Sequence, residues 1–147
     1  KNITLKKQKY DFLTYKNLVD KSECFVVKKG KFNKNKSIRV RVLSQLMKKN
    51  RFSIKNKQIE KSLKYLSNFN DFALVIIKDK KSLKQKIFEE TKNNNILRYY
   101  GIGAQIIKDL NIKNMILVSR SKKKIIALDG FGIKIIKQEI IKWKKNS

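Results

Sequence analysis

The stretch at residues 97–132 constrains the fold more than any other, because it places several distinct patterns in a fixed order. Ile102, Ile106 and Leu110 recur at helical spacing and predict a helix over residues 101–110 with one apolar face. The apolar run MILV that follows predicts a buried strand. A basic turn and the glycine-containing segment LDGFG complete the stretch. These residues therefore predict a helix that leads into a strand.

The same stretch resembles the C-terminal half of GTP cyclohydrolase II, the zinc enzyme that opens the guanine ring at the start of riboflavin synthesis. The family motif Tyr-Gly-Ile-Gly-Ala-Gln-Ile-Leu is matched by residues 100–107. The family's Thr-Asn-Asn-Pro-x-Lys turn is matched by residues 119–124, and its Leu-Glu-Gly-Tyr-Gly segment by residues 128–132. Asn111 stands where family members commonly carry a helix-ending glycine, in a left-handed position that asparagine tolerates. The matches keep the family's order and spacing, which makes the resemblance specific.

The resemblance extends into the first half of the chain, where Lys29 and Gly30 match a family turn. It implies an α/β (α+β) fold, with a single GTP cyclohydrolase II-like domain of mixed sheet and flanking helices over residues 10–147. Residues 1–9 are expected to precede this domain as a basic N-terminal arm. The first residue is Lys1 and not methionine, so we expect a trimmed chain, from which either a targeting segment has been removed or a disordered start has been left out.

Local patterns predict the remaining elements. Residues 38–42 alternate apolar and basic side chains, which is typical of a half-buried strand with its arginines on one face. Residues 71–77 form a continuous apolar run, which predicts a strand buried on both faces. Cys24 lies in an apolar segment and is predicted to be a small buried residue. Further strands are predicted over residues 11–15, 23–27 and 133–141, and helices over residues 56–66 and 81–92.

The zinc ligands of the resembled family are missing from this sequence. In the enzymes a strand runs into Arg-Val-His-Ser-Glu-Cys, and Cys-x-Cys follows ten residues later. The matching positions carry Leu46, Lys57 and Ile59, and the chain has no histidine to replace the thiolates. A hydrolytic zinc site needs three nitrogen, oxygen or sulfur ligands and one open position, which these side chains do not supply. We therefore expect a pseudoenzyme with no catalytic residue, no zinc and no other cofactor.

Three positions match family residues that contact the substrate phosphate or purine, namely Arg98, Ser119 and Lys124. A guanidinium, a hydroxyl and an ammonium near the start of a helix would suit an anion. The alternative is a remnant basic patch that now meets RNA phosphate. The loop after residue 77 favours this alternative, because it lacks the arginines, glycines and glutamate with which the family grips its substrate.

The charge of the chain is its most unusual property, with 38 Lys+Arg against 11 Asp+Glu and a net charge of +27. The codon bias of an AT-rich genome explains lysine in place of arginine, but it does not explain the scarcity of acids. Such a domain repels itself unless a polyanion neutralises it, which favours a nucleic acid over an anionic membrane. No sequence-reading motif is present, so binding is expected through backbone phosphates. The predicted nucleic-acid contacts are Lys28, Lys29, Lys31, Lys48, Lys49, Arg51, Lys55, Lys57, Lys80, Lys81, Lys122, Lys123, Lys124, Lys142, Lys144 and Lys145.

The sequence leaves two functions open. The first is a non-catalytic structural component of a ribonucleoprotein, in particular an organellar ribosome of an AT-rich organism, in a mitochondrion or plastid and otherwise in the cytoplasm. Its partners would be RNA, above all rRNA, and neighbouring proteins of a large assembly, with no membrane involved. In that setting Trp143 either anchors the chain end or stacks on a base. The alternative is a riboflavin-pathway protein, either a diverged cyclohydrolase or an inactive partner of an active one, which stoichiometric zinc would favour.

Overall fold

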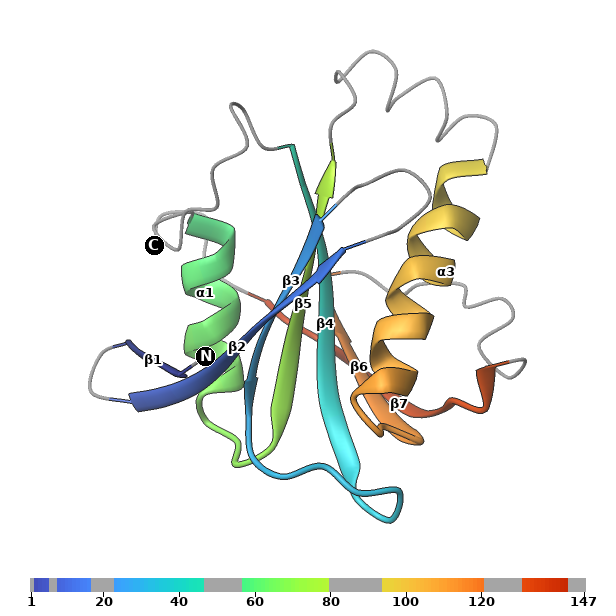
Figure 1. The fold of residues 1–147 in the computed structure, drawn as a ribbon. Helices are drawn as coiled ribbons and strands as arrows, with labels where there is room; N and C mark the ends of the chain where they lie inside the picture. Colours follow the sequence, from blue (N-terminus) through green and yellow to red (C-terminus); the bar gives the residue numbers. More distant parts are fainter. Residues whose placement is uncertain are drawn as a thin grey trace.

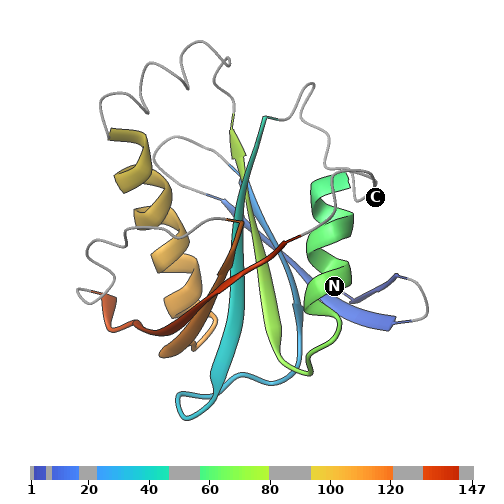
Figure 2. The same ribbon diagram turned by 180° about the vertical axis from the view of Figure 1, so that it is seen from behind.

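A computed structural model describes residues 2–5, 8–16, 23–46, 57–79, 94–120 and 131–142. Seven strands form one sheet in the order β1-β2-β3-β5-β4-β6-β7, with α1 against one face and α3 against the other (Figures 1 and 2). The strands are β1 (Asn2–Leu5), β2 (Gln8–Lys16), β3 (Glu23–Lys29), β4 (Ser37–Leu46), β5 (Phe72–Asp79), β6 (Asn114–Ser119) and β7 (Lys134–Ile140). The helices are α1 (Lys57–Leu66) and α3 (Asn94–Asp109).

The sheet is mixed, and β5 separates its antiparallel part from its parallel part. β5 pairs antiparallel with β3, and β3 and β1 in turn pair antiparallel with β2. On its other side β5 pairs parallel with β4, and the parallel pairing continues through β6 to β7. The chain passes from β4 to β5 through α1 on one face, and from β5 to β6 through α3 on the other. The predicted α/β class with a mixed sheet and flanking helices is therefore confirmed.

Alternate residues of β5 point into two separate cores, which explains its continuous apolar run. In the α1-side core, helix residues pack against one face of β5: Ile59, Leu63 and Leu66 against Phe72, Leu74 and Ile76. In the α3-side core, Ala104, Ile106 and Ile107 pack with Ala73, Val75 and Ile77. Cys24 belongs to the α3-side core and is buried, as predicted. A strand covered on both faces needs apolar side chains in every position, and this sequence supplies them.

The end of α3 confirms the prediction for Asn111, whose φ of 63° is left-handed. The Asn111 amide donates to the carbonyl of Lys108 (3.0 Å), and the Ile112 amide donates to that of Ile107 (3.2 Å). These two bonds are those of a Schellman motif, with Asn111 at the residue that reverses the chain. Ile107 and Ile112 are both buried, which adds the hydrophobic contact that usually accompanies the motif.

Three sequence expectations need correction. Residues 2–5 are not a free arm, because they form β1 and pair with β2 in a short antiparallel hairpin. The strand at residues 38–42 is not half-buried, because α1 covers the face that carries its arginines and leaves Arg41 only 5% exposed. The helix predicted from residue 101 begins at Asn94, so its glycines lie inside the helix. A Cβ added at Gly103 would lie 3.9 Å from Val42 Cγ1, an ordinary packing distance.

The other predicted elements within the described ranges are confirmed with small shifts of their ends. The helix expected over residues 81–92 and the position of Trp143 lie outside the described residues. In the part of the chain that the structure describes, no helix has the length and apolarity needed to cross a bilayer.

Candidate functional site

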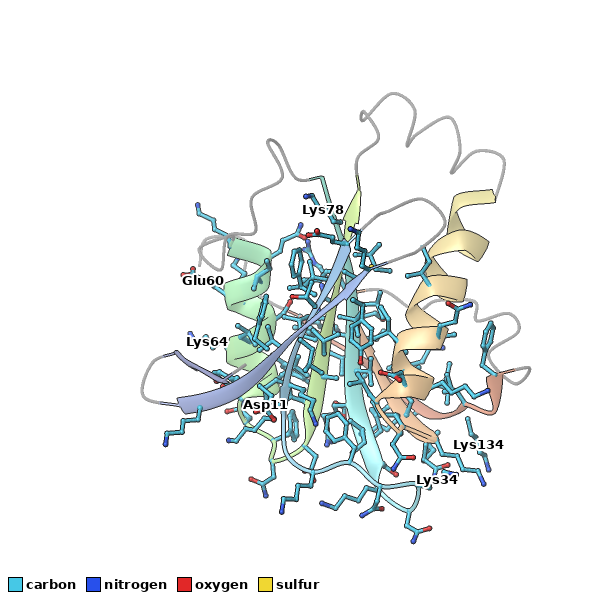
Figure 3. The ribbon with its side chains drawn as sticks, viewed as in Figure 1. Asp11, Lys34, Glu60, Lys64, Lys78 and Lys134 are labelled. Atoms are coloured by element: carbon cyan, nitrogen blue, oxygen red, sulfur yellow. The ribbon has the colours of Figure 1, made fainter. Side chains whose placement is uncertain are left out.

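The carboxyl ends of the parallel strands are the candidate site for a ligand. After β4 the chain turns to α1 on one face, and after β5 it turns toward α3 on the other. Adjacent parallel strands whose connections leave on opposite faces open a crevice at their carboxyl ends, where α/β folds commonly bind ligands. Gln45 and Leu46 of β4 stand beside Lys78 and Asp79 of β5 at this end, and Figure 3 shows Lys78 there.

A buried arginine, Arg41, links the strands near this end of the sheet to α1. Arg41 donates from Nε to Ser62 Oγ (2.8 Å) and from Nη1 to the Val118 carbonyl (3.4 Å), so it joins β4 to α1 and β6. Ser62 Oγ in turn donates to the Gln58 carbonyl of α1 (2.7 Å). Burial, and to a lesser degree the charge of Arg120, lowers the pKa of Arg41 from its ordinary value to about 10. Arg41 therefore remains a cation at neutral pH.

Other basic and polar groups lie at the same end of the sheet. Lys78 and Ser119 are buried at the ends of β5 and β6, and Arg120 follows as an exposed residue. We call Arg41, Lys78, Ser119 and Arg120 the carboxyl-end site. Arg41 and Lys78 point to the α1 side of the sheet, whereas Ser119, next to Val118 of the α1-side core, points to the α3 side. The basic groups at this end are of the kind that binds phosphate or carboxylate.

Comparison with known proteins identifies the family. The sequence model of GTP cyclohydrolase II matches residues 1–140, almost the whole chain. This chain belongs to the GTP cyclohydrolase II family. The match includes residues 2–5, in agreement with the strand that replaces the expected N-terminal arm.

Curated relatives of this GTP cyclohydrolase II-family chain are riboflavin proteins that it matches in part. The riboflavin biosynthesis protein RibBA of Aquifex aeolicus is 37% identical over 70 residues, which cover 44% of this chain and 17% of that protein. RibBA of Bacillus subtilis is 51% identical over 39 residues, or 26% of this chain and 10% of that protein. A 3,4-dihydroxy-2-butanone 4-phosphate synthase of Sulfurospirillum multivorans is 50% identical over 48 residues, or 32% and 14%. The matched region thus spans less than a fifth of each relative.

A solved structure shares the fold. It is RibBX, described as a two-domain 3,4-dihydroxy-2-butanone 4-phosphate synthase from A. baumannii. The TM-score is 0.61 at 17% identity, and the alignment covers 98% of this chain and 39% of RibBX. At this identity the likeness concerns the fold alone. The GTP cyclohydrolase II-family chain therefore has a fold that is also found within that larger two-domain protein.

The three family positions predicted to contact phosphate or purine are only partly described. Ser119 ends β6 and is buried within the carboxyl-end site. Arg98 lies near the N-terminus of α3, which reaches the same end of the sheet (Figure 1). Lys124 lies outside the described residues. The fold thus brings two of the three positions to one end of the sheet, and it adds Arg41, Lys78 and Arg120, which the sequence argument did not include.

The positions matched to the family's zinc ligands carry side chains that do not fit zinc. Ile59 is fully buried in the α1-side core, and Lys57, two residues earlier on the same helix, is exposed. Leu46 is the last residue of β4. Neither an isoleucine nor a leucine offers a donor atom, and an ammonium repels the metal. Within the described ranges no three His, Cys, Asp or Glu side chains gather as a metal site would require.

The predicted nucleic-acid surface is described at only a few positions. Lys28, Lys29 and Lys31 lie at the end of β3 and in the loop that follows, with Lys28 Nζ 4.4 Å above the centre of the Phe32 ring. Lys57 and Lys142 are exposed at the opposite end of the sheet. The described members thus occupy two ends of the molecule. The others, outside the described residues, are Lys48, Lys49, Arg51, Lys55, Lys80, Lys81, Lys122, Lys123, Lys124, Lys144 and Lys145.

One polar network, which joins β4, β7 and α1, was not predicted from the sequence. Arg39 of β4 donates from Nε and Nη2 to the two carboxylate oxygens of Glu139 in β7, at 2.9 and 3.1 Å. Tyr65 of α1 donates to the same carboxylate (3.0 Å), and the Arg39 guanidinium lies 3.6 Å from the centre of the Phe69 ring. The two charged residues are 100 positions apart in the sequence, so no local pattern could have paired them.

Proposed function

We propose that this chain is a non-catalytic GTP cyclohydrolase II-family protein that serves riboflavin biosynthesis beside an active enzyme. The observation that carries the proposal is the burial of Ile59 in the α1-side core. At that position the resemblance expects a zinc thiolate, and this chain has an apolar side chain that contributes to folding instead. Without the metal, nothing lowers the pKa of an attacking water toward neutrality. Ring-opening by the family's chemistry therefore has no support from these residues.

The carboxyl-end site supports a retained affinity for phosphate. Arg41 and Lys78 are cations held in fixed positions by burial, and Arg120 adds an exposed guanidinium. Such groups attract the phosphates of a nucleotide without reading its base. We therefore expect GTP to bind no better than ATP or pyrophosphate. A clear preference for guanine in a competition titration would show that base recognition persists, and would favour a diverged enzyme.

Catalysis is tested by giving the purified protein GTP with Mg²⁺ and Zn²⁺ and measuring formate and pyrophosphate. We expect no release above a blank, while an active GTP cyclohydrolase II in the same assay reports that the conditions work. Stoichiometric zinc in the purified protein, or slow but real turnover, would overturn the pseudoenzyme proposal.

The role beside an active enzyme is tested by isolating the native protein and identifying what accompanies it. We expect enzymes of riboflavin synthesis, and we expect added protein to change the stability or the rate of the active cyclohydrolase. Absence of both effects would reject the partner role.

A second candidate function, RNA binding in a ribonucleoprotein, is favoured by the charge. With 11 acids and 38 basic residues, most cations have no carboxylate to pair with inside the chain. Two of the described acids are already engaged, Asp71 with Lys36 and Glu139 with Arg39. If about six lysines contact phosphates, RNA affinity should fall by roughly three orders of magnitude between 50 and 200 mM salt. No binding at low salt, or binding that ignores salt, would reject this candidate, and co-purifying rRNA would favour it.

A further inference from the structure

A second basic feature lies at the other end of the sheet, where β4, β6 and β7 begin. A cleft of about 330 Å³ opens there. Its charged lining comes from Lys34, Lys108 and Lys113, and the rest of its lining comes from Asn111, Ile112, Phe131 and Gly132. We call it the amino-end cleft. Figure 3 shows Lys34 at this end, below the C-terminal end of α3.

The three lysines come from three different segments that backbone contacts hold together. Lys34 lies in a turn that Asn33 stabilises, because its side-chain oxygen accepts from the amides of Asn35 (2.9 Å) and Lys36 (3.0 Å). The side-chain amide of Asn114, the first residue of β6, donates to the Lys34 carbonyl (3.1 Å). This contact fixes the turn beside the segment that carries Lys113. The rim of the cleft is therefore set by the fold.

The start of β7 and the end of α3 are fixed in the same way. The Lys134 amide donates to the Lys113 carbonyl (2.7 Å), which holds the start of β7 beside the segment that leads into β6. Lys108 is in the last turn of α3, just before the Schellman motif. In that motif the carbonyls of Ile107 and Lys108 each accept a backbone amide, so they are less available as acceptors for the Lys108 ammonium group.

Among the described residues that line the cleft, none carries a carboxylate. The nearest acid in sequence, Asp109, accepts a hydrogen bond from the Tyr15 hydroxyl (2.7 Å) on the far side of the helix end. Asp71 is paired with Lys36 (3.6 Å). A helix C-terminus carries about half a negative charge, which three ammonium groups exceed. The described lining of the cleft therefore carries a net positive charge.

The back of the cleft is apolar. Ile112 is buried, and Phe131 packs against the α3-side core with part of its ring still accessible. An apolar wall beside a cluster of cations suits a ligand that carries phosphate on an organic group. A bare metal cation would be repelled by the three ammonium groups.

We propose that the amino-end cleft binds a phosphate group of a nucleotide or of an RNA strand. This goes beyond the function proposed above, because the cleft lies at the opposite end of the parallel strands from the carboxyl-end site. The lysines supply the charge-assisted contacts, and the Phe131 ring offers a face for a base or another flat group.

The test compares two triple variants that remove the same charge. The cleft variant is Lys34→Gln, Lys108→Gln and Lys113→Gln. The control variant is Lys9→Gln, Lys16→Gln and Lys64→Gln, three exposed lysines on β2 and α1. Pyrophosphate, GTP and a short RNA strand are titrated into each protein by calorimetry at about 50 mM salt, with unfolding curves to verify that both variants fold.

We expect pyrophosphate binding at the cleft to weaken at least about tenfold in the cleft variant, because the cleft loses three charge-assisted contacts, while any binding at the carboxyl-end site stays unchanged. The control variant should differ from the wild type by less than about threefold, because exposed charges farther away than a Debye length are screened. If RNA affinity falls in the same selective way, the phosphate comes from RNA. If only pyrophosphate and GTP are affected, it comes from a small nucleotide. Equal losses in both variants, or no pyrophosphate binding by the wild type, would overturn the proposal.

Discussion

Replacing Glu139 with glutamine should destabilise the fold by about 2 kcal/mol. Its carboxylate accepts two hydrogen bonds from Arg39 and one from Tyr65, and Arg39 also stacks on Phe69. The side chains of Arg39 and Glu139 are 24% and 13% exposed, between the surface and the interior. Exposed ion pairs contribute up to about 1 kcal/mol, whereas breaking a buried pair costs roughly 3–5 kcal/mol. A destabilisation of about 2 kcal/mol, between these two limits, corresponds to a fall in Tm of about 4–8 °C for a chain of this size.

The destabilisation caused by Glu139→Gln should become smaller as the pH falls. The hydrogen bonds from Arg39 hold the pKa of Glu139 below its ordinary value of 4.5, although burial acts the other way. A carboxylate with a lowered folded-state pKa stabilises the protein above its unfolded pKa, and this contribution is lost as the pH falls through the folded pKa. The difference between the wild type and Glu139→Gln should therefore be full at pH 7 and shrink as the pH falls below 4.5.

Urea unfolding at several pH values measures the effect, and a double-mutant cycle with Arg39→Gln isolates the pair. Glu60→Gln is a suitable control, because Glu60 is an exposed acid at the start of α1, where its loss should cost less than about 1 kcal/mol. The reasoning is refuted if Glu139→Gln costs no more than the control, or if its coupling energy with Arg39 is below about 0.5 kcal/mol. A penalty that stayed constant into acid would also refute it.

Three further substitutions test backbone geometry by their effect on the urea midpoint. Gly30→Ala should cost about 2–3 kcal/mol, because Gly30 has a φ of +96° and an added Cβ would lie 2.9 Å from the Asn70 carbonyl oxygen and against the Asp71 side chain. Gly103→Ala, the matched change inside α3, should instead stabilise by up to about 1 kcal/mol, since its Cβ meets only ordinary contact and alanine favours a helix. Asn111→Gly should stabilise by about 0.5 kcal/mol and Asn111→Val should cost about 1–2 kcal/mol, because only the second change strains a left-handed residue. A loss for Gly103→Ala, or no loss for Gly30→Ala, would contradict the packing described.

Features set by neighbouring residues could be predicted from the sequence. The apolar run of β5, the face of α1 that carries Ile59 and the left-handed turn at Asn111 all follow from local spacing and side-chain chemistry. The period-2 pattern of β4 also placed Arg39 and Arg41 on one face correctly. Their burial could not be predicted, because it depends on α1 and β7 covering that face.

Features that join distant segments were not accessible to the same reasoning. Nothing in a periodic pattern says that β5 lies between β3 and β4, or that residues 2–5 pair with β2. The amino-end cleft likewise depends on three strand starts that the strand order brings together. The resemblance supplied the fold class where periodicity could not. It pointed to residues at the carboxyl ends of the strands and gave no indication of the lysines at the other end.

The position of β5 between β3 and β4 has a consequence for how the chain folds during synthesis. β3 and β4 run in opposite directions and are joined by the short loop at residues 30–36, yet they do not pair with each other. A nascent chain that ends near residue 46 can close these two strands into a hairpin, since local contacts form faster than distant ones. Residues 72–79 must then open that hairpin before the native sheet can form. A chain that forms this hairpin has to break the pairing of β3 with β4 before β5 can insert between them. Conditions that slow the opening of the hairpin should favour aggregation through the exposed strand edges.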